Sequence, residues 1–202
     1  MTLRKTARWM ILAFATAFAM TIAIRLTLGP HERMVTALRA TARWSFVWFW
    51  LASVAAPLCT LFGPRFKPLA QHARDLGLSF ASAHLVHIGL VAWMYVVSVP
   101  DLGRTAVILF STGAVWTYLI AILSFADVSK GIPPRAVRLF RITGVEYISV
   151  VFFIDFYKNP FGGGWKHAIF YAPFVALTAV GPILRLAAAI KRQANLHALV
   201  TS

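Results

Sequence analysis

Long apolar runs separated by short polar segments are the main pattern along this chain. Each run is close to the length of about 20 residues that a helix needs to cross a bilayer. The pattern predicts six transmembrane helices, over residues 9–28, 44–62, 76–99, 105–125, 140–156 and 167–186. The expected fold class is therefore an all-α integral membrane protein, a six-transmembrane helical bundle that forms a single domain over residues 1–202.

The composition agrees with a membrane protein and limits what else the chain can contain. Mean hydropathy is +0.73 and 59% of the residues are hydrophobic, which is typical of a membrane protein rather than a soluble domain. Six spans use most of the 202 residues, so no nucleotide-binding domain of ordinary size fits beside them. Any reducing equivalents or nucleotide energy would have to come from a separate partner.

The net charge of +14 is distributed unevenly between the two sides of the predicted bundle. With residues at span ends counted toward the nearer side, the termini and the even-numbered connections carry 13 Lys and Arg residues, and the odd-numbered connections carry 7. Basic residues are enriched on the cytoplasmic side, so both termini are expected in the cytoplasm of a bacterial cell with the bundle in its inner (plasma) membrane. The expected partner of these charges is the lipid bilayer and not nucleic acid, because no soluble basic face remains.

The first apolar run has two interpretations. Arg4, Lys5 and Arg8 precede it, an arrangement that a cleaved signal peptide shares with a first membrane span. Because the remaining sequence is itself multispanning, we expect an uncleaved span over residues 9–28.

Two histidines interrupt the third predicted span. His84 and His87 are three residues apart, so both project from roughly the same helical face. His87 is about eleven residues into the span, roughly 16 Å deep at a rise of 1.5 Å per residue. Polar residues at this depth are costly and often functional, although each histidine could instead only hydrogen-bond a neighbouring helix.

Glu146 lies inside the fifth predicted span. A carboxylate in this position needs a partner, because an unpaired buried charge has a large desolvation cost. Glu146 could pair with His87 or His84 in a buried polar cluster, or its side chain could extend to the cytoplasmic face.

Several segments resemble the ferric reductase-like transmembrane domain family. The run Arg74-Asp-Leu-Gly-Leu is followed, eleven residues after Leu76, by His87. This spacing is similar to the third span of that family, which includes the heme-binding membrane subunit of the periplasmic methionine sulfoxide reductase system. Residues 123–125 and 134–147 are similar to the end of its fourth span and the start of its fifth. The resemblance covers spans two to five, about half the chain, and it implies a heme b with His87 as an axial ligand of the iron.

The family usually supplies histidines from the fifth span as well, at positions where this chain has Phe140 and, at or near the second, Phe153. Three possibilities remain open. Heme could be held by His87 or His84 with His167, at the start of the sixth span, as a substitute ligand. It could be five-coordinate, or heme could have been lost while the fold persists.

The sequence thus supports two hypotheses of different classes. The first is a membrane electron-transfer protein, the heme b subunit of an oxidoreductase, working with a separate flavin- or quinone-linked partner protein. The second is a non-heme membrane protein, either a scaffold or assembly subunit or a small proton-coupled carrier that uses a buried His–Glu cluster. A cavity of porphyrin size between the third and fifth spans favours the first, and tightly packed aromatic side chains there favour the second. No catalytic residue is indicated.

Overall fold

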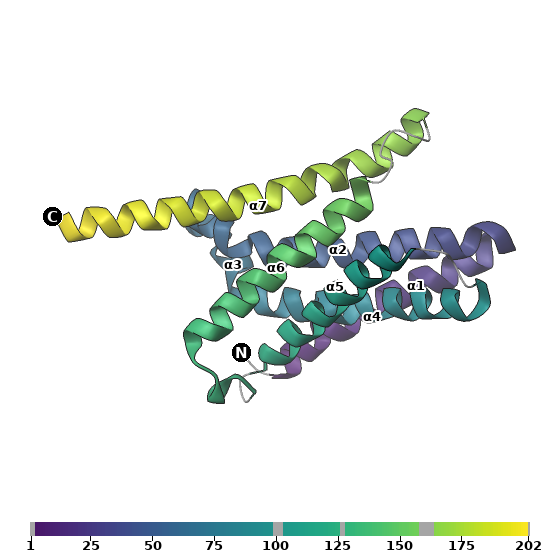
Figure 1. Cartoon of the computed structure of the whole chain (residues 1–202), viewed down its shortest axis with the longest axis horizontal. Coiled ribbons are helices and arrows are strands. Elements are labelled where there is room, and N and C mark those ends of the chain that lie inside the picture. The colour runs from purple at the N-terminus through teal and green to yellow at the C-terminus, as the bar shows by residue number, and fades with distance from the viewer. Residues whose placement is uncertain (1–2, 99–102, 126–127, 158–163, 202) are drawn as a thin grey trace.

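The computed structural model describes residues 3–98, 103–125, 128–157 and 164–201, and within these ranges the chain is a bundle of helices (Figure 1). Six helices are long. They are α1 (Leu3–Thr27), α2 (Pro30–Phe62), α4 (Ala73–Ser98), α5 (Arg104–Leu123), α6 (Pro134–Tyr157) and α7 (Gly164–Thr201). Three short elements, η1 (Pro64–Phe66), α3 (Lys67–Gln71) and η2 (Val128–Gly131), lie in the connections.

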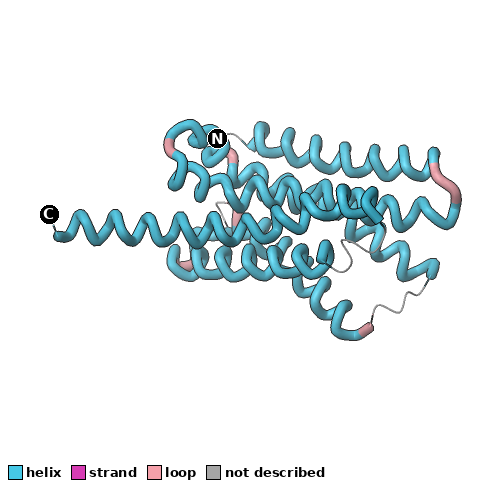
Figure 2. The backbone as a smooth tube through the Cα atoms, turned by 90° about the horizontal axis from the view of Figure 1, so that it is seen from above, coloured by secondary structure: helices cyan, strands magenta, loops and turns pink. Residues whose placement is uncertain are grey.

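Successive long helices run in opposite directions along the bundle, and both termini lie toward the same end (Figures 1 and 2). This end also holds α3, and α7 extends beyond the other helices there. We call it the basic end, because it carries most of the exposed cations. These are Arg4, Lys5, Arg8, Arg65, Lys67, Arg74, Arg135, Arg138, Arg141, Lys191 and Arg192.

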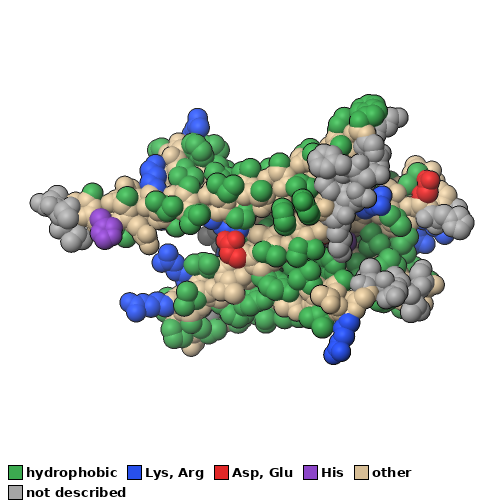
Figure 3. Space-filling view, turned by 45° about the horizontal axis from the view of Figure 1, so that its top comes forward, with side chains coloured by type: hydrophobic (Ala, Val, Ile, Leu, Met, Phe, Trp, Pro, Cys, Tyr) green, Lys and Arg blue, Asp and Glu red, His purple; other side chains and the backbone are tan. Residues whose placement is uncertain are grey.

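Five of the long helices are long and apolar enough to cross a membrane, namely α1, α2, α4, α5 and α7. Their outward faces carry large exposed apolar side chains, such as Ile11, Val96, Ile108 and Leu186. Hydrophobic side chains also cover the middle of the face seen in Figure 3, with Lys and Arg side chains toward its ends. The chain is a multi-pass helical membrane protein.

Several helices are longer than the apolar pattern predicted, and the extension is largest in α2 and α7. Residues 30–43, expected as a basic loop, form the first turns of α2. Pro30 is favourable in the first turn of a helix, and no Gly or Pro follows until Pro57, so nothing in this segment breaks the helix. Likewise α7 continues past residue 186 to Thr201, since no glycine or proline follows Pro182. The apolar pattern marks the lipid-facing part of each helix and not its ends.

Helices α1, α2 and α4 pack closely at small residues. Ala13 and Ala17 of α1 are fully buried, which lets the backbones approach one another. Ser82 of α4 donates a hydrogen bond to the Met10 carbonyl at 2.9 Å, and Trp44 of α2 donates to the Ala13 carbonyl at 3.3 Å. These contacts fix α4 and α2 against α1.

Contacts along the whole of α7 hold it against α2. The Arg43 guanidinium lies 4.6 Å from the centre of the Tyr171 ring. Trp50 Nε1 donates to the Leu177 carbonyl at 2.9 Å, and Lys191 donates to a carbonyl in the last turn of α2 at 3.1 Å. Basic side chains are favourable at the C-terminal end of a helix, where the carbonyls lack helical partners.

Helix α6 reaches α5 through Gly144, which is buried. A Cβ atom at this position would lie 2.7 Å from Trp116 Cε3 and 2.5 Å from Ile120 Cδ1, both on α5. Trp116 in turn packs on Phe140 of α6, with 4.4 Å between the ring centres. The close approach of the two helices therefore depends on a missing side chain.

We predict that Gly144→Ala destabilises the protein by about 1–3 kcal/mol, because the added methyl group overpacks the α5–α6 contact. Equilibrium unfolding in mixed micelles measures the effect. Gly89→Ala is the matched control, since Gly89 is exposed on α4 and no atom lies within 4 Å of its added Cβ. Equal stability of the two variants would contradict the close packing at Gly144.

Candidate functional site

The first turn of α4 is anchored to α1 by a buried carboxylate. Asp75 is 2% exposed and accepts hydrogen bonds from Thr6 Oγ1 at 2.7 Å and from His72 Nδ1 at 3.3 Å. Its position in the first helical turn also places a negative charge at the positive end of the helix dipole. These interactions fix the start of the helix that carries His84 and His87.

His84 and His87 lie one above the other on the face of α4 that meets α2. Their rings stack with 5.3 Å between centres and 23° between planes. Two buried hydroxyl groups of α2 contact them, His87 Nδ1 to Thr41 Oγ1 at 3.2 Å and His84 Nδ1 to Ser45 Oγ at 3.3 Å. The spacing of four residues between Thr41 and Ser45 thus matches the spacing of three between the histidines.

The hydrogen bonds of the two hydroxyl groups assign the tautomer of each ring. Thr41 donates its hydroxyl hydrogen to the Ala37 carbonyl at 2.8 Å, and Ser45 donates to the Ala42 carbonyl at 2.9 Å. With the one hydrogen of each hydroxyl group given to its carbonyl, the tautomer that satisfies both contacts has the histidine Nδ1 as the donor toward α2. Each ring then keeps its lone pair on Nε2, the atom that can accept a proton or bind a metal.

Three phenylalanine rings, from three helices, lie next to His84. Phe49 of α2, Phe80 of α4 and Phe152 of α6 have ring centres 5.2 to 6.1 Å apart, and all three side chains are buried. The His84 ring lies 5.3 Å from Phe80 and 6.2 Å from Phe152. We call these three rings the aromatic plug.

A cavity of about 450 Å³ lies on the other side of the plug from the histidines. Phe49 and Phe80 line its inner end, Gly77 lies along its wall, and Arg74 and Arg141 lie toward the basic end. Both arginines are exposed, so the cavity is accessible from that end. One face of α4 carries the cavity, the plug and the histidines in sequence. Along it lie residues 74 and 77 at the cavity, residue 80 in the plug, and the two histidines at 84 and 87.

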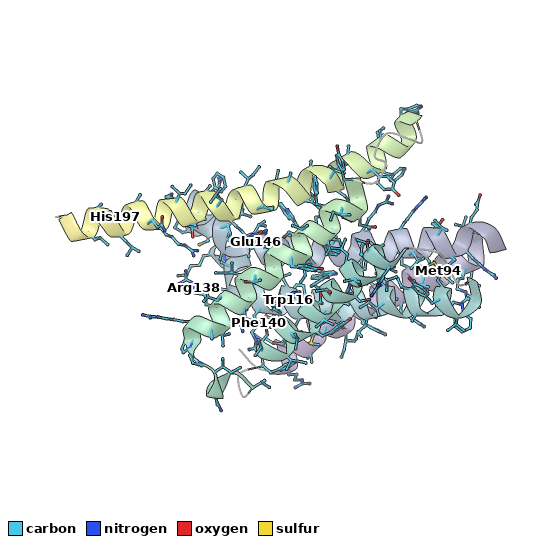
Figure 4. All side chains as sticks on the ribbon, viewed as in Figure 1. Met94, Trp116, Arg138, Phe140, Glu146 and His197 are labelled. Carbon is cyan, nitrogen blue, oxygen red and sulfur yellow. The ribbon has the colours of Figure 1, made fainter. Side chains whose placement is uncertain are left out.

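Glu146 pairs with Arg185 of α7 and not with a histidine. Arg185 donates from Nε to Oε1 at 2.6 Å and from its terminal NH2 to Oε2 at 2.7 Å, which is the strong bidentate geometry. The same NH2 group contacts Ser149 Oγ at 2.9 Å. In Figure 4 Glu146 lies between α6 and α7. The contact of Glu146 with His84 or His87 that the sequence suggested is absent, because Glu146 lies on the α7-facing side of α6.

The positions where the family has span-five histidines hold phenylalanines with other contacts. Phe140 packs on Trp116, as Figure 4 shows, and Phe153 is 38% exposed and stacks on Tyr157. His167, the expected substitute ligand, belongs to α7, but its side chain lies outside the described residues. Among the described residues, no group of three or more His, Cys, Asp or Glu side chains could hold a metal ion.

Heme does not fit between α4 and α6 in this arrangement. The Nδ1 contacts suit an iron ligand, since a metal-binding histidine commonly donates its other nitrogen to a neighbouring group. However, Phe152 of α6 packs directly against His84, and neither histidine lines the cavity. Aromatic rings therefore occupy the space beside His84 on the side that faces α6.

Thr41, Ser45 and Arg185 belong to the site but were not singled out from the sequence. Thr41 falls in the segment predicted to be a loop, so no sequence pattern placed it beside His87. Arg185 had a usable signal: it is a charged residue inside a predicted span, and Glu146 is a residue of opposite charge inside another.

Comparison with known proteins gives no relative: no family model, no curated protein and no solved structure matches this chain.

We predict a strong coupling between Glu146 and Arg185. Glu146→Gln and Arg185→Gln should each destabilise the protein by about 1–3 kcal/mol, because each leaves a charge without its partner. The double variant should lose less than the sum, with a coupling of roughly 0.5–3 kcal/mol in equilibrium unfolding.

Arg138 provides the matched control for this cycle. It is exposed on α6, two turns from Glu146, and Arg138→Gln combined with Glu146→Gln should be additive. Additivity in the Glu146–Arg185 cycle itself would contradict the pairing.

Proposed function

We propose that this chain is a small proton-coupled carrier of a bacterial inner membrane. The cavity receives the solute from the basic end, the aromatic plug closes its inner end, and the histidine pair beyond the plug takes up the proton. The observation that carries the proposal is the order of these three features along one face of α4.

The proposal includes α6 as a sixth span. Its basic residues Arg135, Arg138 and Arg141 are confined to its first two turns, at the basic end, and Asp155 lies in its last turn, at the other end. Glu146, deeper in the helix, is neutralised by Arg185, which allows both charges to lie within the bilayer. With six crossings both termini share one side, and the excess of basic residues there favours the cytoplasm.

The histidines can accept protons through atoms that the packing leaves available. Water in the cavity delivers a proton to the Nε2 lone pair of His84 when Phe80 moves aside. The stacked ring of His87, with its centre 5.3 Å from that of His84, gives the proton a second position before it leaves on the opposite side. Buried histidines in membrane proteins commonly form such relays.

Heme-based electron transfer, the function that the family resemblance implies, has less support. It would need Phe80 and Phe152 to give up their contacts with His84, and a second ligand from elsewhere in the chain. A scaffold role is compatible with the packing but gives no reason for an accessible cavity that ends at an aromatic plug.

The aromatic plug provides the test of the carrier. We predict that Phe80→Ser, reconstituted in liposomes that contain a pH-sensitive dye, gives a several-fold faster proton leak than the wild type. The loss of the ring connects the water-accessible cavity to His84. Adding His84→Phe and His87→Phe to this variant should abolish the extra leak, because the proton-accepting groups are gone while the volume is kept.

Phe156→Ser is the matched control for the leak measurement. Phe156 is as buried as Phe80, but it neither lines the cavity nor packs on His84, so its loss should loosen the core without opening a path. The carrier is refuted if folded Phe80→Ser protein stays as tight as the wild type, or if the leak survives the loss of both histidines.

An absorption spectrum separates the carrier from electron transfer. We predict no Soret band in detergent-purified protein that was produced with ample heme, before or after dithionite reduction. A Soret band that shifts on reduction and is lost in His87→Ala, but kept in a His197→Ala control, would establish the heme protein instead.

A further inference from the structure

We infer that the cavity binds an amphiphilic oxyanion, a molecule with one phosphate or carboxylate group and an apolar body. This inference rests on the proposed function, because it names the class of solute that the carrier takes. The anionic group would lie between Arg74 and Arg141, and the apolar body would extend inward to Phe49 and Phe80.

The charges along the cavity wall favour an anion. Two arginines line it, and no Asp or Glu is among its lining residues. The carboxylates closest in sequence are engaged elsewhere: Asp75 faces α1 and bonds Thr6, and Glu146 is paired with Arg185. The cavity therefore offers positive charge without a neutralising carboxylate on its wall.

The two arginines have donors left for a ligand. Arg141 donates one hydrogen bond, to the Leu123 carbonyl at the end of α5 at 2.9 Å, which holds the guanidinium beside the cavity. A guanidinium has five N–H donors, so most of those on Arg141 remain for an anion. Planar donor pairs of this kind match phosphate and carboxylate oxygens.

The hydroxyl groups on the wall leave anion recognition to the arginines. Ser53, Thr117 and Ser124 each donate their single hydrogen to a carbonyl of their own helix. While these bonds are in place, the hydroxyl groups have no second hydrogen for an oxyanion, and the arginines have donors left. The anionic group is thus directed to the basic end of the cavity.

The inner part of the cavity fits an apolar body. Its walls there are Phe49, Phe80, Ile120 and Ile148, and its volume of about 450 Å³ lies in the usual range for ligand pockets, about 300–1,000 Å³. Gly77 borders this space without a side chain. A Cβ atom added there would contact only Ala52 Cβ, at 3.9 Å, so the space beyond it is open. A longer side chain at position 77 would occupy the cavity.

Isothermal titration of the full-length protein in zwitterionic nanodiscs tests the inference. Two phosphate probes are used: hexyl phosphate, which dissolves in water, and lysophosphatidic acid, which enters from the membrane. Hexyltrimethylammonium is the cationic control. We expect at least one phosphate probe to bind and the cation not to bind. Tighter binding of hexyl phosphate assigns the ligand to the aqueous phase, and tighter binding of lysophosphatidic acid assigns it to the lipid. Equal binding of the cation would overturn the inference.

Two sets of variants locate the binding. Arg74→Gln combined with Arg141→Gln should weaken phosphate binding at least tenfold, whereas Arg138→Gln, which removes an exposed arginine outside the cavity, should leave it unchanged. Gly77→Met should block binding by filling the cavity, and Gly89→Met on the exposed face of α4 should not. Unchanged binding in the double arginine variant or in Gly77→Met would overturn the inference.

These outcomes are separable from those of the proton measurement. Phosphate binding with no proton leak in Phe80→Ser would keep the anion site and refute the carrier. The reverse pattern would keep the proton path and refute the oxyanion.

Discussion

The interior of a bilayer offers no water to polar groups, so each polar side chain inside this bundle must find a partner within the protein. The ionisable side chains do so across helix boundaries, whereas many serine and threonine hydroxyl groups bond a carbonyl of their own helix. Asp75 bonds α1, the two histidines bond hydroxyl groups of α2, and Glu146 bonds Arg185 of α7. Among the described side chains two buried polar atoms lack a partner, Trp48 Nε1 and Ser79 Oγ. Pairing of polar groups therefore fixes which helix faces meet.

Packing then determines what the polar groups can do. Buried alanines let α1 and α4 approach closely, and Gly144 does the same for α6 and α5. The remaining space is shared between an aromatic plug and a cavity. Phe80 of the plug contacts both the cavity and His84, so it lies between the cavity and the proposed proton acceptors. A path that can be closed in this way is what alternating access requires, and it is the physical reason for preferring a carrier over a static scaffold.

The sequence predicted the all-helical membrane architecture, because about 20 consecutive apolar residues have few other stable arrangements. Among the described residues, five of the six predicted spans lie in helices long and apolar enough to cross a membrane, and α6 is not one of them. It also singled out His84, His87 and Glu146, which the structure places at contacts between helices. It did not identify their partners, since these depend on which helix faces meet, and the periodicity of one helix does not encode the rotation of the next. Phe140 and Phe153 illustrate the point: both are apolar residues of α6, yet one packs on Trp116 and the other is exposed. The cavity was equally hidden, because it arises from five elements whose spacing no single segment determines.

The central claim is that α2 orients both histidines so that each keeps a proton-accepting Nε2. Nitrogen-15 magnetic resonance of histidine-labelled protein in nanodiscs tests it most directly, because nitrogens with and without a bound hydrogen have distinct chemical shifts. The account predicts that His84 and His87, assigned from single-histidine variants, both carry hydrogen on Nδ1 and a lone pair on Nε2 at neutral pH. It predicts further that Thr41→Val and Ser45→Ala each disturb the neighbouring ring alone. Hydrogen on Nε2 of either ring, or signals broadened by bound iron, would contradict it.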